Sequence, residues 1–428
     1  MDYGTTSARI CHIYLHLAEL CCVVAPKGSA LHHALRLTWY NNVSKRNLLL
    51  DVTRLLERLH NGLMPTGIDR VSLAYVQHYG VRARAVLSFR GHWTVLKQTD
   101  SERLFGWLNG ASHTRSLIRR TFAQAFFSSW QATNIENSVL LHTSHSGMEY
   151  SRYTQSFLRK AVRPVFMVHD LIPMTHPEYC RPGIAEQHRR RIHFALQHAS
   201  GLIANSEATL ESLAAESRRA DIPMPQNVVA RLAPAKIVGR PDTASPISAP
   251  FFVVLGTIEA RKNHWFLLHV WRSLVEQLGE KTPRLIIVGR RGWECENAID
   301  MLERCDKLRG YIVEESQCSD ERLFSYLQHA RALLFPSFAE GYGMPLVEAL
   351  AQRVPVIASD LSVFREIANQ TPSYLDPLDG PGWIAAIKRY MDADDPVRNA
   401  QINRIEKYQV PTWAEHFEIV DRFIEELD

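Results

Sequence analysis

The chain has 428 residues, 46% of them hydrophobic, which is enough apolar material for two separate cores. The net charge of +4 hides an asymmetry, because residues 1–235 carry 27 Lys and Arg against 16 Asp and Glu whereas residues 236–428 carry 22 against 29. The seven cysteines form no Cys-x-x-Cys pair, which argues against a zinc site and a disulfide framework and indicates a reducing compartment.

Residues 1–46 differ in composition from the rest of the chain, and we expect them to be a poorly ordered N-terminal extension. Their most apolar run, residues 10–26, is interrupted by His12, His16 and Glu19. A membrane span needs about 20 apolar residues, and a signal peptide needs a basic start and a small-residue cleavage site, so we predict neither. We therefore expect a cytoplasmic protein.

Between residues 47 and 235, short apolar runs alternate with segments of helical periodicity, which is typical of a parallel sheet with helices on both faces. The predicted strands are residues 47–52, 84–88, 138–142, 164–168 and 201–204. Residues 68–79 have helical spacing. Residues 234–250, with their Pro, Gly and Ser, interrupt this rhythm as a linker would. We therefore predict that residues 47–235 form one Rossmann-like domain.

The alternation resumes after the linker, so we predict a second Rossmann-like domain over residues 236–412. Its predicted strands are residues 251–256, 284–288, 310–313, 332–335, 354–358 and 373–375. The last amphipathic helix, residues 413–428, is expected to pack back on the first domain. Ligands of open parallel sheets bind beyond the carboxyl ends of the strands, so functional residues are expected in the loops that follow the strands.

The most informative of these loops joins the strand at residues 332–335 to a helix that begins near Pro345. Glu340 lies in the loop and Glu348 on the opening turns of the helix. Between them, Gly341-Tyr342-Gly343 allows a tight turn and presents amide N–H groups beside the positive end of the helix dipole. Either glutamate alone would be an ordinary solvated or helix-start acid. Together with this turn they suit an anion and hydroxyl groups, so we predict a nucleotide-sugar site.

With Glu340 and Glu348 separated by seven residues around a Gly-Tyr-Gly turn, the chain resembles glycosyltransferase family 4. It is most similar to the mannosyltransferase B-like branch of bacterial enzymes that build O-antigen, capsule and exopolysaccharide chains. The resemblance runs from about residue 47 to the C-terminus. It implies the GT-B fold, in which two Rossmann-like domains face each other across a central cleft, with acceptor on the first and nucleotide sugar on the second.

A second informative loop follows the strand at residues 251–256, where Gly256 precedes the adjacent cations Arg261 and Lys262. These cations are placed to clamp a diphosphate and to neutralise the charge that develops on a leaving nucleoside diphosphate. A basic pair before a helix is also a common solvated cap. The run resembles the Gly-Thr-x-x-x-Arg-Lys-Asn pattern of bacterial family 4 enzymes. Thr257 stands where other branches have an extra arginine, so fewer cations are expected to hold the phosphates.

In the first domain, His169-Asp170-Leu171-Ile172-Pro173 follows the strand at residues 164–168. A histidine there can donate to a sugar hydroxyl or polarise a backbone carbonyl, and a lone His-Asp is structural about as often. The string resembles the His-Asp-Leu-Ile-Pro of bacterial mannosyltransferases, in which the histidine lies against the donor sugar. His169 is therefore the predicted catalytic helper, with Asp170 orienting it or the acceptor.

Three other positions carry weaker predictions. Gly67, in the loop after the first strand, resembles half of the Gly-Gly pair of this fold and would allow close approach of phosphate or acceptor. Its neighbours Asp69 and Arg70 either contact acceptor or serve as cap and surface pair. His145 is a candidate contact for an acceptor hydroxyl, and Ser206 is either a family feature or a plain helix N-cap.

The resemblance also implies roles for these residues. Arg261 and Lys262 would hold the diphosphate, and Glu348 the ribose hydroxyls. Glu340 and the amides from Gly341 to Met344 would hold the donor sugar, while His169 faces the reacting carbon. Asp392-Ala393-Asp394-Asp395 is predicted to lie at a helix end, so no metal site or other cofactor is expected.

The function implied is a retaining, metal-independent transfer of a hexose, with mannose from GDP-mannose as the first choice. GDP-, dTDP- or UDP-linked rhamnose, fucose or glucose fit the same motifs. A GT-B nucleotide-sugar epimerase and a non-catalytic glycan-binding protein are alternatives from other classes. The expected acceptor is a growing glycan or a polyprenyl-diphosphate-linked glycan.

The basic first half matches an anionic partner, because positive charge attracts phosphate-bearing surfaces. Arginines gather at residues 115–120, 152–163 and 189–191, within segments that also carry Phe, Leu and Ile. No helix-turn-helix, finger or RNA-binding signature accompanies them, so we expect the inner face of the cytoplasmic membrane and not nucleic acid. Ordinary solvated helix faces remain the alternative.

Overall fold

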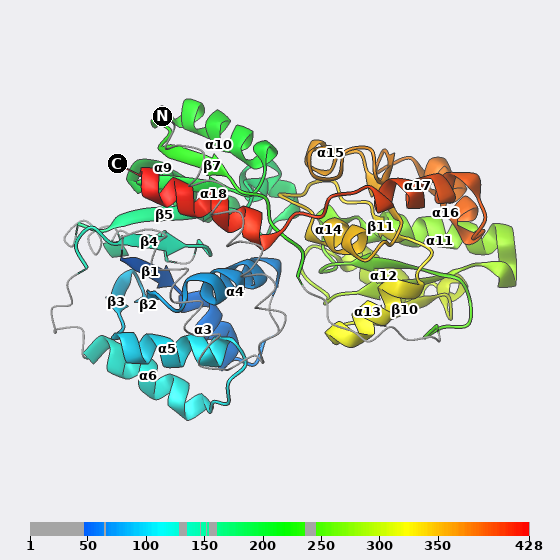
Figure 1. Ribbon diagram of the computed structural model, residues 1–428. Helices are drawn as coiled ribbons and strands as arrows, with labels where there is room; N and C mark the ends of the chain where they lie inside the picture. The colour runs from blue at the N-terminus through cyan, green and yellow to red at the C-terminus, as the bar shows by residue number, and fades with distance from the viewer. Residues whose placement is uncertain are drawn as a thin grey trace, which may run out of the picture.

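The structure, a computed structural model, describes residues 47–63, 66–127, 135–145, 147–150, 152–153, 161–235 and 245–427. The predicted N-terminal extension and most of the predicted linker lie outside the described residues. The described chain forms two lobes, each built on one sheet with helices on both faces (Figure 1).

The first sheet has seven strands in the order β3-β2-β1-β4-β5-β6-β7. They are β1 (Leu48–Asp51), β2 (Ala83–Phe89), β3 (His92–Val95), β4 (Val139–His142), β5 (Arg163–Val168), β6 (Gly201–Ala204) and β7 (Gln226–Val229). All five predicted strands are confirmed within one or two residues. β3 and β7 were not predicted, and β3 pairs antiparallel with β2, so the expectation of a wholly parallel sheet is wrong at this edge. A two-residue turn is enough to join antiparallel strands, whereas parallel neighbours need a crossover.

Helices cover this sheet on both faces, which is why β1, β4 and β6 are buried along their whole length and read as apolar runs. They are α3 (Thr53–His60), α4 (Gly67–Tyr79), α5 (Gln98–Leu108), α6 (Arg115–Phe127), the short α8 (Ile172–Thr175), α9 (Ile184–His198) and α10 (Glu207–Ala220). The predicted helix at residues 68–79 is α4.

The second sheet has six parallel strands in the order β10-β9-β8-β11-β12-β13. They are β8 (Phe251–Leu255), β9 (Arg284–Val288), β10 (Ile312–Glu315), β11 (Leu333–Phe335), β12 (Val356–Ser359) and β13 (Ser373–Leu375). The helices are α11 (His264–Leu278), α12 (Glu296–Arg304), α13 (Asp320–His329), α14 (Met344–Ala351), α15 (Ser362–Ala368), α16 (Gly380–Met391) and α17 (Pro396–Glu406). All six predicted strands of this domain are confirmed.

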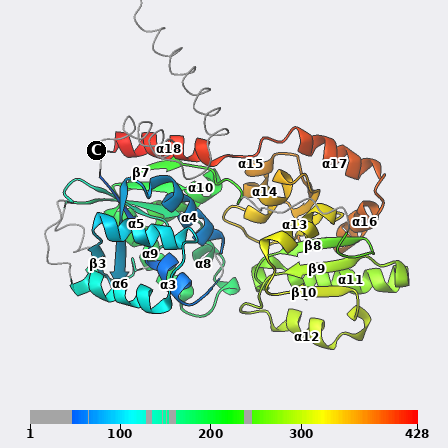
Figure 2. The ribbon, with the colours of Figure 1, turned by 60° about the horizontal axis from the view of Figure 1, so that its bottom comes forward.

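The final helix, α18 (Trp413–Glu426), runs back along the first lobe, as predicted, and is red in Figure 2. The rings of His78 and Phe417 stack with centroids 3.9 Å apart. The Tyr75 hydroxyl lies 2.9 Å from His416 Nε2, and Arg82 donates to Asp421 at 2.9 Å. α18 is thus part of the first domain's core although it follows the second domain in the chain.

The strand order reverses direction between β1 and β4 in the first sheet and between β8 and β11 in the second. A crevice opens beyond the carboxyl ends of strands at such a point. Side chains from the loops after β8 and β11 therefore meet, because these two strands are hydrogen-bonded neighbours.

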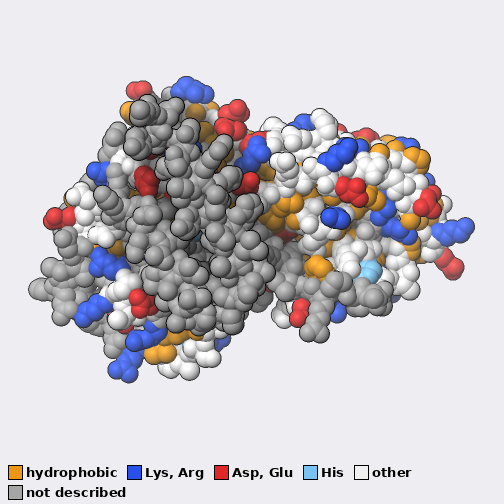
Figure 3. Space-filling view, viewed as in Figure 1, with side chains coloured by type: hydrophobic (Ala, Val, Ile, Leu, Met, Phe, Trp, Pro, Cys, Tyr) orange, Lys and Arg blue, Asp and Glu red, His pale blue; other side chains and the backbone are white. Residues whose placement is uncertain are grey.

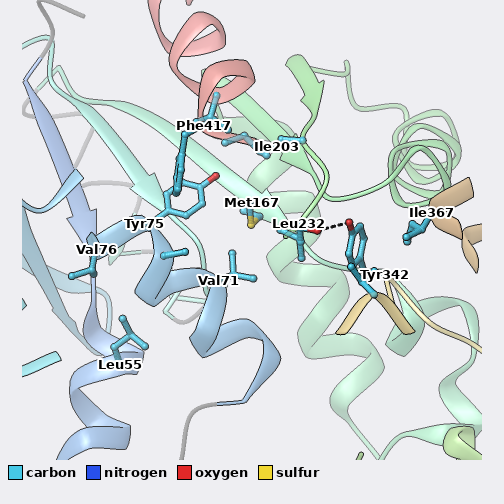
Figure 4. Close-up of a cluster of buried hydrophobic side chains, with 14 of the residues drawn as sticks. Leu55, Val71, Tyr75, Val76, Met167, Ile203, Leu232, Tyr342, Ile367 and Phe417 are labelled. Carbon is cyan, nitrogen blue, oxygen red and sulfur yellow. Dashed lines mark hydrogen bonds between the residues drawn. The ribbon is translucent and has the colours of Figure 1, made fainter. Parts of the chain in front are cut away.

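The two lobes touch directly. Tyr342, in the loop after β11, donates its hydroxyl hydrogen to the Leu232 carbonyl of the first lobe at 2.6 Å (Figure 4). Figure 3 shows basic and acidic side chains interspersed over the second lobe on the face in view. The ends of β8 and β11 and the region where the lobes meet define the candidate site.

Candidate active site

The cationic pair and the first glutamate of the motif converge. One carboxylate oxygen of Glu340 lies 2.5 Å from Lys262 Nζ, and the other lies 2.9 Å from Arg261 Nη1. Ser337 donates to the Lys262-bound oxygen at 2.7 Å. The side chains of Lys262 and Glu340 are each less than a tenth exposed. The loops after β8 and β11 therefore build one charged centre, as the sequence predicted.

Hydrogen bonds to backbone carbonyls hold these two loops together. The Phe338 amide donates to the Arg261 carbonyl at 2.8 Å, and Asn263 Nδ2 donates to the Pro336 carbonyl at 3.1 Å. Gly256 has φ +135°, a conformation that a side chain would strain, and it leaves room for the Lys262 stem beside it. Gly343 has φ +102°, and a Cβ there would lie 2.6 Å from the Phe364 ring. The two glycines thus let the loops after β8 and β11 approach each other closely.

The charges at this centre are strongly coupled. Burial by itself would raise the pKa of Glu340, but Arg261 and Lys262 outweigh it and hold the pKa at about 2. Burial lowers the pKa of Lys262, although Glu340 opposes the shift. Arg261 is also paired with Glu259 at 2.8 Å, and burial raises the pKa of Glu259. Glu340 is ionised at neutral pH, so the loops hold an internal carboxylate where cations would grip a diphosphate.

The second glutamate of the motif faces the other lobe. Glu348 Oε1 lies 3.4 Å from Arg70 Nη1 of α4, and Arg70 Nη2 donates to Asp320 at 3.1 Å. Burial raises the pKa of Glu348 to about 7, with Arg70 and the Ala235 backbone opposing it. Arg70 was predicted to be either an acceptor contact or half of a surface pair. The pair with the exposed Asp320 confirms the surface-pair alternative, and Arg70 in addition crosses between the lobes to the carboxylate assigned to ribose.

His169 is buried at the end of β5, and its Nε2 donates to the Thr143 carbonyl at 2.8 Å. A carbonyl only accepts, so Nε2 carries the hydrogen, and burial lowers the pKa of His169, which favours the neutral ring. Nδ1 is then an acceptor and cannot donate to a sugar hydroxyl. Thr143, not Asp170, holds the Nε2 side of the ring, because Asp170 Oδ1 instead accepts from the Ile172 amide at 3.1 Å. Of the two roles predicted for Asp170, orientation of His169 through a hydrogen bond at Nε2 is not what the structure shows, and orientation of the acceptor stays a prediction.

The loop that carries His169 is supported by two further buried histidines. His145 Nε2 donates to the Met167 carbonyl at 2.6 Å, and His188 Nε2 donates to the Asp170 carbonyl at 3.0 Å. Burial lowers the pKa of both rings, so both are neutral. Their ring centroids lie 5.7 Å apart, and that of His145 lies 5.6 Å from that of His169. His145 therefore supports the backbone before His169 through Nε2, and its contact with an acceptor hydroxyl stays a prediction.

Comparison with known proteins agrees with this arrangement. Residues 249–393, which contain β8, β11 and the charged centre, match the family model described as Glycosyl transferases group 1.

Residues 249–393 form a group 1 glycosyltransferase domain.

Curated relatives match up to about half of this chain. The chain is 31% identical over 247 residues to the serotype-specific mannosyltransferase WbdA of Escherichia coli, a match covering 54% of this chain and 30% of WbdA. It is 28% identical over 241 residues to the O-antigen chain mannosyltransferase B of Escherichia coli, covering 54% of this chain and 62% of that protein. It is 31% identical over 152 residues to RfbU of Salmonella typhimurium, an O-antigen chain mannosyltransferase, covering 34% of this chain and 40% of RfbU. The matches thus span about one to two thirds of each relative's length.

Solved structures share the overall architecture. HepE from Anabaena, in complex with UDP and glucose, matches 89% of this chain and 100% of its own with a TM-score of 0.63 at 13% identity. Sucrose-phosphate synthase from Thermosynechococcus elongatus matches 89% of this chain and 99% of its own with a TM-score of 0.59 at 16% identity. The predicted GT-B fold is confirmed, and the resemblance to glycosyltransferase family 4 is confirmed for the glycosyltransferase domain.

In the Gly341-Tyr342-Gly343 turn of the glycosyltransferase domain, the Tyr342 side chain contacts the other lobe, whereas the backbone amides lie at the start of α14. The Tyr342 side chain points away from the charged centre to Leu232, so only its backbone remains available to a donor. Met344 begins α14, with Gly343 as the N-cap residue, so the amides of this turn lie at a helix N-terminus. A cavity of about 300 Å³, bordered by Asp170, Glu340 and Gly341 among others, lies between the lobes.

Gly67 and Asp69 lie at the start of α4 in the first lobe. Open space lies where a Gly67 Cβ would stand, so no described protein group explains a need for glycine there. Asp69 is fully buried, accepts from the Thr66 amide at 2.7 Å as part of a capping box, and pairs with Arg54 at 2.8 Å. Of the two predictions for Asp69, the capping role is confirmed.

Sequence reasoning missed two side chains of the charged centre, Glu259 and Ser337. It named Arg70 but did not predict that this side chain reaches Glu348 from the other lobe. Glu259 and Ser337 each lie three residues or fewer from a predicted residue, which was the available signal. Asp395 caps α17 through the Val397 amide at 2.8 Å, which confirms that the acidic run lies at a helix end. Among the described residues, no group of three or more His, Cys, Asp or Glu is arranged to hold a metal ion.

Proposed function

We propose that this protein is a retaining, metal-independent glycosyltransferase that moves mannose from GDP-mannose onto a growing bacterial surface glycan. The observation that carries the proposal is the pairing of Glu340 with Arg261 and Lys262 at the ends of β8 and β11. Cations held around one carboxylate at a strand-end crevice, beside a glycine turn at a helix N-terminus, are suited to a sugar diphosphate.

In the proposed mechanism, the donor diphosphate takes over the cations that Glu340 holds in the free protein. Arg261 and Lys262 then stabilise the charge that grows on the departing nucleoside diphosphate. Glu340, released from part of its pairing, accepts hydrogen bonds from donor-sugar hydroxyls. Glu348 accepts from the ribose hydroxyls.

The proposed attack is from the front face, on the side that the leaving group departs from. Retention through a covalent intermediate would require a carboxylate nucleophile at the reacting carbon. Glu340, with a pKa of about 2 and three hydrogen-bond donors, is a poor nucleophile and a good hydroxyl acceptor. The leaving diphosphate is therefore proposed to take the acceptor's proton, with the neutral His169 ring facing the reacting carbon. Trapping of a sugar covalently on a carboxylate would contradict this mechanism.

The proposed donor follows the relatives, three of which carry mannosyltransferase in their names. HepE, by contrast, is described with UDP and glucose. The nucleotide and the sugar are therefore the first quantities to measure.

The proposed acceptor is a polyprenyl-diphosphate-linked glycan at the inner face of the cytoplasmic membrane. Among the described residues, no helix is long and apolar enough to cross a bilayer. The α6 helix exposes Arg115, Arg119 and Arg120 together with Leu117, which suits an anionic, partly apolar surface. The basic run at residues 189–191 is less available, because Arg191 pairs with Glu149 at 2.8 Å. Sedimentation with anionic liposomes that is lost in high salt would support this partner.

The deciding experiment is a donor panel. The purified full chain is incubated with GDP-mannose, GDP-fucose, dTDP-rhamnose, UDP-glucose and a lipid-linked acceptor, and nucleotide release and glycan mass are followed. Mannose transfer from GDP-mannose, unchanged by EDTA and absent with Glu340→Ala, is the expected result. Epimerised free nucleotide sugar with no transfer, or binding without turnover, would contradict the proposal.

A further inference from the structure

The first turn of α10 is where the first lobe forms hydrogen bonds with the glycosyltransferase domain. α10 and α15, which come from different lobes, lie side by side near the junction (Figure 1). Three groups converge on this turn: the Gly341 carbonyl, the His169 carbonyl and the Glu366 carboxylate. Gly341 directly follows Glu340, so this contact acts on the donor loop itself.

Two buried hydroxyls of the first lobe bind that loop. Ser206 Oγ lies 3.1 Å from the Gly341 carbonyl oxygen, and Thr209 Oγ1 lies 3.2 Å from the same oxygen. Ser206 and Thr209 are 0% and 4% exposed. Each hydroxyl has a single hydrogen to donate, and the Ser206 oxygen also accepts from the Thr209 amide at 3.1 Å. Ser206 is therefore the predicted N-cap of α10 and, in addition, a contact to the other lobe.

The same turn holds the backbone of His169. Asn205 Nδ2 donates to the His169 carbonyl at 2.9 Å, and Thr209 Oγ1 lies 3.4 Å from that carbonyl. A single short segment thus bonds both to the loop that carries Glu340 and to the residue expected to face the reacting carbon.

The loop and His169 are also in direct contact. A Cβ on Gly341 would lie 2.4 Å from the His169 carbonyl oxygen and 2.6 Å from Asp170 Cβ. The backbone of Gly341 is not in the left-handed region, so an alanine there would be excluded by the opposite lobe and not by its own conformation. The absence of a side chain at this position is what lets the two lobes meet.

A carboxylate completes the contact. Glu366 of α15 accepts from the Glu207 amide at 2.8 Å and from the Ala208 amide at 3.1 Å. Amide groups at a helix N-terminus favour a negative partner, so this contact adds attraction between the lobes.

We propose that Ser206 and Thr209 are positioning residues for transfer, which set the register of the Glu340–Gly341 segment against His169. This inference rests on the proposed function, since it assigns these hydroxyls a part in the same reaction. They act by fixing the distance between groups on different lobes. Misplacement of reacting groups by about 1 Å lowers rates by up to about a hundredfold.

Thr209→Val is the cleanest variant, because it removes the hydroxyl, keeps the shape, and leaves the Ser206 cap of α10 in place. Since a hydrogen bond is worth roughly 0.5–1.5 kcal/mol, we expect kcat to fall about three- to tenfold. The affinity for nucleotide, measured by calorimetry, should stay within about twofold, because Arg261, Lys262 and Glu348 are all in the second lobe. Thr209→Ser should restore kcat.

Ser217→Ala is the matched control. Ser217 lies near the end of α10, and its hydroxyl donates to the Ile222 carbonyl of the same lobe at 2.6 Å. We expect its kcat to match that of the unmodified protein. A decrease of nucleotide affinity and melting temperature in Thr209→Val as large as its decrease of kcat would indicate a merely structural role and overturn the proposal. So would a kcat for Thr209→Val equal to that of Ser217→Ala.

Small-angle X-ray scattering of the full chain tests the register without relying on activity. Gly341→Ala should force the lobes apart and increase the radius of gyration, while its circular dichroism spectrum stays unchanged. If no donor is transferred by the unmodified protein, the proposed function fails, but this measurement still decides the contact. An unchanged radius of gyration in Gly341→Ala would overturn the register.

Discussion

Glu340 and Glu348 come from one short loop–helix junction and are both buried, yet their pKa values are shifted in opposite directions. Glu340 is held by two cations and a serine of its own domain, and its pKa is about 2. Glu348 has the Ala235 backbone and a longer contact to one cation, Arg70 of the other lobe, and its pKa is raised to about 7. Burial penalises both carboxylates, so the number and distance of cations decides which one stays charged. A carboxylate that depends on the opposite lobe is the one whose charge responds to pH and to domain contact.

Glu340→Ala should have the largest effect. It removes the proposed acceptor for donor-sugar hydroxyls and leaves Lys262 buried without its partner, so we expect transfer to fall by about a thousandfold and the melting temperature to decrease. Nucleotide release and thermal unfolding measure the two effects. Glu303→Ala, which breaks an exposed pair with Arg291 in the same domain, is the control. Retention of substantial transfer would remove Glu340 from the mechanism.

Lys262→Met should lower kcat/KM for the donor by about a hundredfold, because one of two diphosphate cations is lost. It should also raise the pKa of Glu340. A lowered carboxyl pKa stabilises the fold above the ordinary value near 4.5, and this stability is lost as pH falls toward 2. The variant should therefore begin to unfold at higher pH than the unmodified protein during acid titration. Lys307→Met, at an exposed pair with Glu276, should change neither quantity.

The raised pKa of Glu348 predicts that donor binding improves with pH. If the ionised carboxylate is what accepts from the ribose, GDP-mannose should bind roughly tenfold more tightly at pH 8 than at pH 6, since a group with a pKa of about 7 passes from about one-tenth to nine-tenths ionised.

Stability should change in the opposite direction. The folded protein prefers the protonated form of Glu348, so this residue's contribution to the free energy of unfolding decreases between pH 4.5 and 7. In Glu348→Gln, donor affinity and melting temperature should both depend less on pH than they do in the unmodified protein. An unaltered binding profile in that variant would separate Glu348 from the ribose.

Arg70→Gln should have the smallest effect. Loss of this cation leaves Asp320 nearby and raises the pKa of Glu348 further, so the midpoint of donor binding against pH should move upward, with little change in affinity at pH 9. Arg103→Gln, at an exposed pair with Asp100 in the same lobe, is the control. A midpoint that does not move would show that Arg70 has no electrostatic influence on Glu348.

Much of the fold was predictable because its strands are buried on both faces and stand out as apolar runs. β3 and β7 were missed because they are short and carry polar residues. The link between Arg261-Lys262 and Glu340 was predictable for a topological reason, since parallel strands place their following loops at one sheet edge.

Sequence alone therefore determined the two βα domains, the charged centre and the separate locations of the two glutamates. Only the tertiary structure decided which of those residues pair with one another and how their pKa values shift. Arg70 and Glu348 are 278 positions apart, and the His169 tautomer depends on a carbonyl 26 positions away. Local patterns report which face of an element is buried, but partners on different lobes are chosen only when the lobes dock. That is why only the structure shows the raised pKa of Glu348, the orientation of the Tyr342 side chain and the hydrogen bonds from α10 to Gly341.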